Sequence, residues 1–227
     1  KSHVLSKRER EITAYHEAGH ALVSSVLPYA DPVQKISTIS RGRAAGYILK
    51  LPDQDRRMQS RKEFLDDIAA LLGGYVAEEM IFDDLTTGPS NDLQVLSGLA
   101  RDMVTKYGMS EAFGQFALET TGGRLVSGLW SEERGYGDEV AEKIDAEVQK
   151  IIAEARERAK DILTQYRPAL DAVVARLMAV ETLEREEYEG ILKAHGAPIR
   201  DYYRDNTEEL PKGDPTKVLA PDTDTLA

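Results

Sequence analysis

The segment His16-Glu17-Ala18-Gly19-His20 constrains this chain more than any other part of its sequence. Two histidines four positions apart lie on one face of an α-helix, about one turn and roughly 6 Å apart. In that arrangement both imidazoles can bind a single tetrahedral zinc ion. Glu17 then lies beside the metal, outside its coordination shell, where it can accept a proton from an attacking water molecule. The motif therefore predicts a helix that carries a zinc-dependent hydrolytic site.

The residues around the motif favour that helix. Ser6 and Glu9 form a predicted capping box at its start, and Pro28 ends the pattern after Leu27. Apolar residues recur at spacings of three and four and predict a buried face, made of Ile12, Tyr15, Gly19, Leu22 and Val26. A polar stripe lies beside it and consists of Thr13, His16, Glu17, His20 and Ser24. Such a stripe is costly in a buried helix unless it is paired, and a metal ion with its water would provide that pairing.

The motif does not specify the third zinc ligand. A third histidine shortly after the motif, as in one class of zinc peptidases, is excluded because Val23, Val26 and Leu27 occupy the relevant positions. No acidic residue lies between Asp31 and Asp53, so we expect the ligand to be a distant carboxylate. The candidates are Glu78, Glu79, Asp83, Asp84 and Asp92.

Asp92 has the strongest physical case among these candidates. Residues 87–92 predict a turn followed by the start of a helix, with Ser90 as its N-cap. A carboxylate in the first helical turn is stabilised in its ionised form by backbone N–H groups and by the helix dipole. An ionised carboxylate in a fixed position suits a zinc ligand, although aspartates at helix N-termini are also common without a metal. Glu79 is the next candidate on spacing.

Together these segments resemble the peptidase domain of the FtsH family of ATP-dependent, membrane-anchored zinc proteases. The similarity runs from about residue 5 to about residue 192 and is carried by residues 14–22, 86–93, 31–33, 41–44, 74–79, 131–133 and 144–148. It implies that His16, His20 and Asp92 bind zinc, one ion per chain, and that Glu17 is the general base. Pro89 stands where the family usually has alanine, and we interpret it as a tolerated change in a turn before a helix.

The resemblance also implies a larger protein. An ATPase module and a membrane anchor would precede Lys1, because this sequence has no Gly-x-x-x-x-Gly-Lys-Ser/Thr phosphate loop and no run of about 18 apolar residues. ATP would act only through that module. The full-length protein would be a homohexamer at the cytoplasmic face of the cell membrane, or of the equivalent organelle membrane. It would degrade unfolded or membrane proteins, and this fragment alone would be soluble.

The composition argues against a nucleic-acid-binding function and against cysteine-based sites. The net charge of −11 argues against a nucleic-acid partner, because a phosphate backbone would be repelled. The absence of cysteine excludes disulfides and thiolate zinc sites. Two other functions stay open, namely an autonomous zinc peptidase that never acts with ATP and a non-enzymatic helical oligomerisation module with a structural zinc. The intact Glu17 and a set of only three good ligands disfavour the second, because catalytic zinc sites keep one position open.

The predicted fold is mainly α-helical, with a small β element near the active site and a C-terminal helical bundle. Helices are predicted over residues 6–27, 60–82, 91–107, 137–166, 168–180 and 184–195. Short strands are predicted within 33–51, where an exposed edge could bind an extended peptide, and a further strand at 115–119.

Residues 1–195 are predicted to form the zinc metallopeptidase domain. Its metal-site half would span about residues 1–121 and its helical half about 137–195. The glycine-rich segment 122–137 would be a mobile surface connection between them. The tail at 196–227 contains several prolines among polar residues and is expected to be disordered.

Overall fold

The computed structural model describes residues 6–40, 45–51, 58–114, 117–118, 125–126, 129–130 and 136–200. Its elements are, in chain order, α1 (Lys7–Val26), β1 (Val33–Ser37), β2 (Tyr47–Lys50), α2 (Arg61–Phe82), α3 (Ser90–Thr105), β3 (Leu125–Val126), β4 (Leu129–Trp130), α4 (Asp138–Gln165), α5 (Arg167–Val180), β5 (Thr182–Glu184) and α6 (Arg185–Ala194). The predicted mainly α fold with a small β element is confirmed. Within the described ranges, no helix combines the length and the apolar character needed to cross a membrane.

Both predicted capping boxes are present. At the start of α1, Ser6 Oγ accepts a hydrogen bond from the Glu9 N–H, and Glu9 Oε2 accepts one from the Ser6 N–H. Ser60 and Glu63 make the same reciprocal pair at the start of α2. Each box pairs two N–H groups that have no partner within the helix, so each helix begins at the predicted residue.

Helix α1, which carries His16 and His20, crosses helix α2 at a pair of glycines. A Cβ atom at Gly19 of α1 would lie 2.4 Å from the Gly73 carbonyl oxygen, and a Cβ at Gly73 of α2 would lie 2.6 Å from that of Gly19. No side chain fits at either position. The glycines therefore let the two backbones approach directly, which brings the face of α1 with His16 and His20 against α2.

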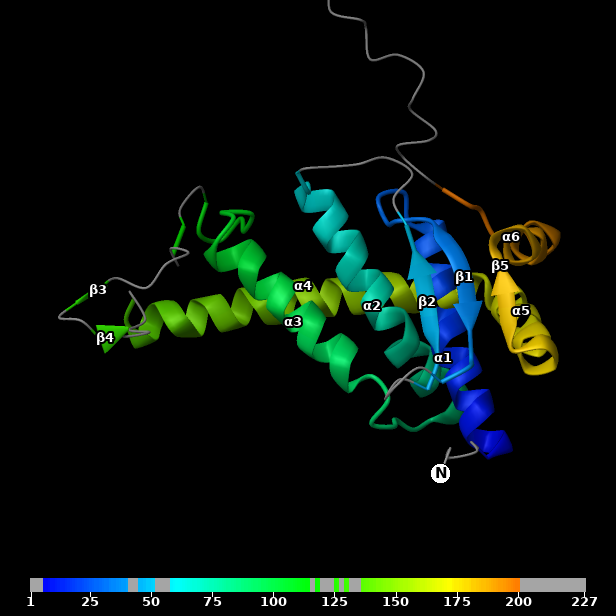
Figure 1. Ribbon diagram of the computed structural model, residues 1–227. Helices are drawn as coiled ribbons and strands as arrows, with labels where there is room; N and C mark the ends of the chain where they lie inside the picture. Colours follow the sequence, from blue (N-terminus) through cyan, green and yellow to red (C-terminus); the bar gives the residue numbers. More distant parts are fainter. Residues whose placement is uncertain are drawn as a thin grey trace, which may run out of the picture.

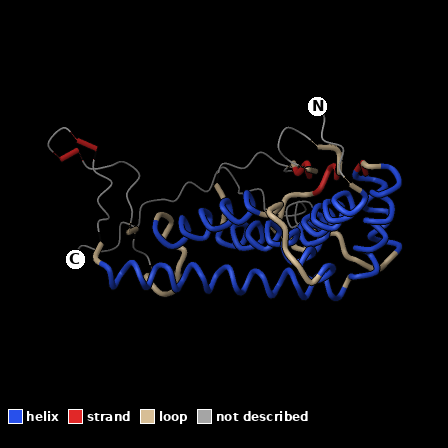
Figure 2. The backbone as a smooth tube through the Cα atoms, turned by 90° about the horizontal axis from the view of Figure 1, so that it is seen from below, coloured by secondary structure: helices blue, strands red, loops and turns tan. Residues whose placement is uncertain are grey.

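The helices and the sheet form layers (Figure 1). Helix α4 runs behind α1, α2 and α3 and packs against all three, whereas α5 and α6 lie at one end of the molecule, where α5 packs against α1. Figure 2 shows α4 along one side of the helical layer and the strands β1, β2 and β5 on the other. The second half of α1 is buried between these layers, because Ala14, Ala18, Ala21, Leu22 and Val23 are all at most 1% exposed.

A three-stranded antiparallel sheet covers α1, in the order β2-β1-β5. Ile36 of β1 pairs with Leu183 of β5, and both side chains are fully buried. Strands β1 and β2 confirm the strands predicted within 33–51. Strand β5 was not predicted, because its three residues separate two helices and give too short a pattern. It forms because Glu181 ends α5 in the left-handed region, at φ 63°, and turns the chain alongside β1.

Helix α3 begins differently from the prediction. Pro89 is the cap residue, Ser90 is the first helical residue, and no side-chain oxygen caps the helix. Asp92 lies in the first turn, as expected. The strand predicted at 115–119 falls mostly outside the described residues, and Ala117 and Leu118, which are described, lie in no strand.

The segment 122–137 also falls largely outside the described residues, apart from the pair β3–β4 and its last two positions. The tail stays a prediction from residue 201 onward. Before that point Ala197 is buried, and the Arg200 N–H donates a hydrogen bond to the Ser25 carbonyl oxygen of α1. The division into two halves stays a prediction as well.

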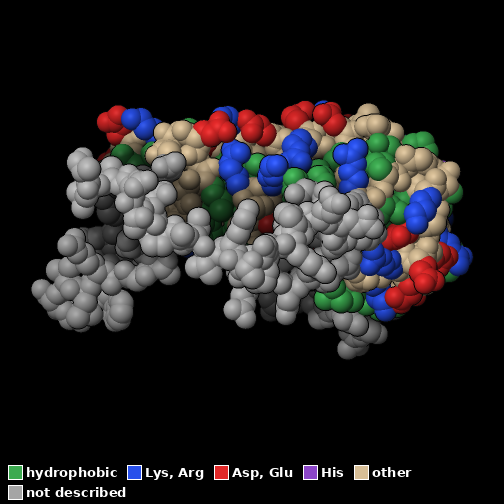
Figure 3. All heavy atoms as spheres, turned by 90° about the horizontal axis from the view of Figure 1, so that it is seen from above, with side chains coloured by type: hydrophobic (Ala, Val, Ile, Leu, Met, Phe, Trp, Pro, Cys, Tyr) green, Lys and Arg blue, Asp and Glu red, His purple; other side chains and the backbone are tan. Residues whose placement is uncertain are grey.

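Charged side chains of both signs lie side by side on the face drawn in Figure 3. Several ion pairs involve α4, which links to α2 through Arg156–Glu79 and Arg158–Asp66. Asp66 is almost fully buried, and its other oxygen accepts a hydrogen bond from the Tyr29 N–H. This aspartate therefore ties the turn after α1 and helix α4 to α2.

Candidate metal centre

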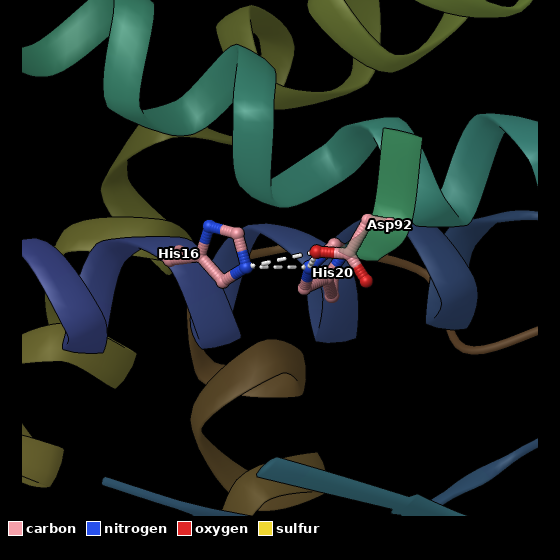
Figure 4. Close-up of side chains that lie close together, drawn as sticks. All are labelled: His16, His20 and Asp92. Atoms are coloured by element: carbon pink, nitrogen blue, oxygen red, sulfur yellow. Dashed lines mark hydrogen bonds and ion pairs between the residues drawn. The ribbon is translucent and has the colours of Figure 1, made fainter. Parts of the chain in front are cut away.

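Three side chains converge from two helices, His16 and His20 from α1 and Asp92 from the first turn of α3 (Figure 4). The two Nε2 atoms are 3.0 Å apart. Asp92 Oδ2 lies 3.3 Å from His16 Nε2 and 3.4 Å from His20 Nε2. These side chains are 12%, 9% and 21% exposed for His16, His20 and Asp92. The structure thus brings together the three residues that the sequence analysis singled out as ligands.

The triangle formed by these atoms has the size of one face of a zinc coordination tetrahedron. Zinc–nitrogen and zinc–oxygen bonds of about 2.0–2.1 Å at tetrahedral angles separate neighbouring ligand atoms by about 3.3 Å. The observed separations of 3.0–3.4 Å match that value. Within the described part of the chain this group contains three ligating residues, so a bound metal would keep a position open for other molecules.

The outer nitrogens of both rings have acceptors that fix their orientation. His20 Nδ1 lies 2.8 Å from the Ala70 carbonyl oxygen of α2, and His16 Nδ1 lies 2.8 Å from Glu78 Oε1. Each Nδ1 can donate its proton to that acceptor, which leaves the Nε2 lone pair directed at the centre. Two lone pairs facing each other at 3.0 Å require a proton or a metal ion between them. The site therefore fits a metal cation.

Glu78 connects His16 to the segment that precedes Asp92. Its Oε2 accepts hydrogen bonds from the Thr86 N–H, at 3.1 Å, and from the Thr86 hydroxyl, at 2.8 Å. The Thr86 hydroxyl oxygen in turn accepts a hydrogen bond from the Gly88 N–H. The carboxylate is almost fully buried. It therefore holds the loop after α2 in the position from which α3 begins with Asp92 in its first turn.

Gly74 leaves the space that the two imidazoles occupy. A Cβ at this position of α2 would lie 2.5 Å from His20 Nε2 and 2.6 Å from His16 Cε1. Any other residue would displace the rings. Glycine in a helix interior costs about 1 kcal/mol relative to alanine, so its presence here marks a packing requirement.

Glu17 lies at the wall of the same cavity, next to the backbone of Gly46. It is 7% exposed, and a Cβ at Gly46 would lie 2.7 Å from Glu17 Oε1. No hydrogen bond from a described residue reaches its carboxylate. Burial without such donors disfavours the anion and raises the pKa of Glu17 to about 7, while the charge on His16 opposes the shift and that on Asp92 adds to it. Glu17 thus presents a carboxylate whose oxygens accept no hydrogen bond from the part of the chain that the structure describes.

Burial, hydrogen bonds and neighbouring charges also shift the pKa values of His16, His20 and Asp92. Burial opposes the charged form of His16, but the hydrogen bonds that its ring donates to Asp92 and Glu78 outweigh burial and raise its pKa to about 9. Burial and the charge on His16 lower the pKa of His20. Burial would raise the pKa of Asp92, yet the hydrogen bonds from His16 and His20 hold it well below its usual range. The hydrogen bonds from both rings therefore favour the ionised form of Asp92.

The remaining acidic candidates from the sequence lie outside this group. Glu79 pairs with Arg156 of α4. Asp83 caps the C-terminus of α2 with φ 50°, and Asp84 accepts a hydrogen bond from the Leu85 N–H. Glu78 contacts the centre only through the outer nitrogen of His16, so it is not one of the three converging ligand residues.

A cavity of about 1000 Å³ surrounds the centre. Helices α1, α2 and α3, strand β2 and the loop before α3 contribute its walls, which include His16, Glu17, His20, Gly46 and Asp92. Sequence reasoning did not assign roles to Ala70, Gly46 or Gly74. No sequence pattern predicts the roles of Gly46 and Ala70, because Gly46 acts through its place next to strand β2 and Ala70 acts through its backbone carbonyl. A sequence pattern does point to Gly74, since two adjacent glycines inside a predicted helix indicate close packing.

Comparisons with known proteins agree with this arrangement. The profile of Peptidase family M41 matches residues 3–191. The relatives include the ATP-dependent zinc metalloprotease FtsH of Pseudothermotoga lettingae, 49% identical over 195 residues, which cover 85% of this chain and 31% of the relative. The proteins of the same name from Bacillus subtilis and Thermotoga maritima are 44% and 46% identical, over 96% and 85% of this chain and 34% and 32% of theirs.

The chain thus spans about a third of the length of the curated relatives that it matches. The profile match covers its N-terminal helix, the converging histidines and aspartate, and the helices up to α6. By this match and these identities, the chain belongs to Peptidase family M41.

Proposed function

We propose that this chain is a zinc endopeptidase unit, in which His16, His20 and Asp92 hold one Zn²⁺ and Glu17 is the general base. The observation that carries the proposal is the convergence of three ligand atoms within 3.0–3.4 Å of one another. Nitrogen and carboxylate donors suit zinc, and the relatives are named zinc metalloproteases. When bound, Zn²⁺ polarises a peptide carbonyl and lowers the pKa of water at the site.

The proposed role of Glu17 follows from a carboxylate that accepts no hydrogen bond from the described residues. It lies one residue from His16 and lines the cavity, so its oxygens face the space where a peptide and a water molecule would meet. Glu17 takes a proton from the attacking water as the carbon–oxygen bond forms. It then delivers that proton to the leaving amide nitrogen as the carbon–nitrogen bond breaks. A pKa raised toward neutrality suits a group that must both accept and release a proton.

Strand β2 is proposed to hold the substrate. It is an edge strand of the sheet, and Tyr47, Ile48 and Lys50 line the cavity. An extended peptide that pairs with this edge would lie across the metal centre and Glu17. Peptides N-methylated at single positions test this, because a lost backbone N–H should weaken cleavage at alternate residues. A complex in which the peptide avoids β2 would contradict it.

The two alternatives are not favoured. A structural zinc normally has four protein ligands, whereas this centre has three among the described residues and an unengaged glutamate beside it. An autonomous peptidase is disfavoured by the relatives, whose names describe ATP-dependent proteases.

The whole protein is proposed to be an ATP-dependent protease of which this chain is the peptidase part. ATP hydrolysis would occur in an ATPase module upstream of Lys1, next to a membrane anchor that places the peptidase at the cytoplasmic face. Unfolded or membrane proteins would be the substrates and the assembly a homohexamer, and no nucleic acid would bind. Family resemblance supports these statements, and light scattering on the full-length protein tests the assembly.

Zinc stoichiometry measured together with peptide cleavage tests the proposal. The chain should bind one zinc per molecule, cleave unfolded peptides without ATP, lose cleavage on chelation and regain it when Zn²⁺ is added. Glu17→Gln should keep zinc and fold but lose several orders of magnitude in kcat, because glutamine cannot accept the proton.

Glu11→Gln is the matched control, because Glu11 lies on the exposed side of the same helix. It should behave like the unaltered chain. An active Glu17→Gln protein would refute the role of Glu17, and a chain that binds no zinc would refute the proposed centre.

A further inference from the structure

Lys50 is the last residue of β2 and lines the cavity that contains the metal centre. Among the described residues that line this cavity it is the one lysine or arginine. The acidic residues that line it are Glu9, Glu17, Glu78 and Asp92. The charged side chains of this lining are therefore acidic except at Lys50 and at the histidines of the proposed metal centre.

Among the described residues, no carboxylate forms an ion pair with the ammonium group of Lys50. Asp66 pairs with Arg158, and Asp67 accepts a hydrogen bond from Gln59. Lys50 interacts with Asp67, Asp31 and Asp92 through longer-range Coulomb attraction. Burial lowers the pKa of Lys50, and these three charges oppose that shift. A partly desolvated cation at the wall of a substrate cavity is suited to bind an anion that enters with the substrate.

We propose that Lys50 determines specificity by binding a carboxylate of the peptide substrate. The proposal rests on the peptidase function proposed above and adds a preferred substrate chemistry to it. Apart from the two histidines, the other charged side chains that line the cavity are acidic, so within the described residues attraction for an incoming carboxylate comes from Lys50 and the proposed metal centre. Because Lys50 is fixed at the end of the edge strand β2, the preference should apply to one position of the peptide.

A series of peptides tests this. A single glutamate is moved along an otherwise neutral unfolded peptide, and kcat/KM at each position is compared with that of the glutamine peptide. The zinc-loaded chain should favour glutamate on the order of tenfold at one position, as expected for one charge-assisted hydrogen bond. Lys50→Met should bring that ratio close to one, mainly through KM, and Lys50→Arg should retain it.

Two further arms identify the source of the carboxylate and control the substitution. Each peptide is assayed with a free and with an amidated C-terminus, which separates a glutamate side chain from a terminal carboxylate. Lys35→Met is the matched control, since Lys35 lies on the neighbouring strand β1 and pairs with Glu184. It should leave every ratio unchanged. Lys50→Gln replaces the charge with a polar group if methionine impairs folding.

The experiment distinguishes a failure of the Lys50 proposal from a failure of the proposed peptidase function. Cleavage of the glutamine peptides by all variants reports on the peptidase function alone. If nothing is cleaved, fluorescence anisotropy of labelled glutamate and glutamine peptides on the zinc-loaded chain decides instead, with the same expected ratio. The role of Lys50 is overturned if the unaltered chain shows no carboxylate preference at any position, or if Lys50→Met keeps it.

Discussion

His16 Nδ1 lies 2.8 Å from Glu78 Oε1, and this contact connects the metal centre to the loop before α3. The same carboxylate accepts two hydrogen bonds from Thr86 through its other oxygen. Glu78 therefore orients one proposed ligand directly and holds the segment that leads to another, Asp92. A group that supports two ligands from outside the coordination shell should influence metal affinity without touching the metal.

Glu78→Gln should weaken zinc binding by about 10- to 100-fold, the usual effect of removing an outer-shell carboxylate. The amide keeps a similar shape but loses the charge that makes the His16 ring a better ligand. Competition with a chromogenic chelator measures the affinity. Glu79→Gln is the control, because Glu79 is adjacent in sequence and pairs with Arg156 instead. Equal affinities for the two variants would contradict the orienting role.

Gly74→Ala should disrupt the centre from within α2. The added methyl group would lie 2.5 Å from His20 Nε2, so the rings must move and zinc affinity should fall at least about tenfold. Gly98→Ala in α3 meets no atom within 4 Å and should raise stability by about 0.5–1 kcal/mol without changing zinc affinity. Chelator competition and urea unfolding distinguish the two effects. If Gly74→Ala binds zinc normally, the close packing of Gly74 against the two imidazole rings is not required for the site.

Asp66 and Asp67 are adjacent but should respond oppositely to replacement by asparagine. Burial raises the pKa of Asp67 to about 6, against the opposing charge of Lys50. Since the folded protein holds this proton more tightly than the unfolded chain, the group favours folding below about pH 4 and loses that contribution as pH rises through 6. Asp67→Asn should therefore be more stable than the unaltered chain at pH 8, on the order of 1 kcal/mol, and no more stable at pH 4.

Asp66→Asn should destabilise the fold at pH 8 by about 1–3 kcal/mol. Asp66 is buried and accepts hydrogen bonds from Arg158 at 2.6 Å and from the Tyr29 N–H at 3.0 Å. A neutral amide leaves the charge of Arg158 uncompensated. Urea unfolding of both variants at pH 4 and pH 8 checks the pair. A stabilising Asp66→Asn, or an Asp67→Asn gain that is independent of pH, would contradict these assignments.

Signals from residues close together in the sequence predicted most of the helices. The capping boxes at Ser6 and Ser60 and the stop at Pro28 depend on neighbours three or four residues away, so the bounds of α1 and α2 were predictable. Strand β5 was not, since its three residues form a strand only because β1 lies beside them. Ser90 was predicted as the cap of α3, whereas the chain begins that helix one residue earlier, after Pro89.

The same distinction applies to the metal centre. The i, i+4 spacing of His16 and His20 indicated both residues from sequence, and the helix-start position favoured Asp92. The groups that orient them could not be predicted in the same way. The Ala70 carbonyl that holds His20 has no side-chain signal, and Glu78 was considered as a ligand, not as the partner of His16. Such contacts depend on how α1 crosses α2 at Gly19 and Gly73, which is a tertiary property.

The role of Asp92 as the third zinc ligand can be tested against that of Glu79, the next candidate. Asp92→Ala removes the only carboxylate oxygen that, within the described residues, lies within 3.4 Å of both Nε2 atoms. It should lower zinc affinity by several orders of magnitude, because two histidines alone form an incomplete site. Helical circular dichroism should be retained, since the Asp92 side chain is not part of the apolar core.

Two substitutions make the Asp92 result specific. Asp102→Ala removes a partly exposed ion pair with Lys106 near the C-terminal end of the same helix, so it should leave zinc affinity unchanged. Glu79→Ala should do the same, because that carboxylate pairs with Arg156 on the side of α4. Zinc titration of the three variants under one buffer gives the comparison. If Glu79→Ala empties the site while Asp92→Ala does not, the third ligand is Glu79, and the convergence of Asp92 on the two histidines is only an ion pair.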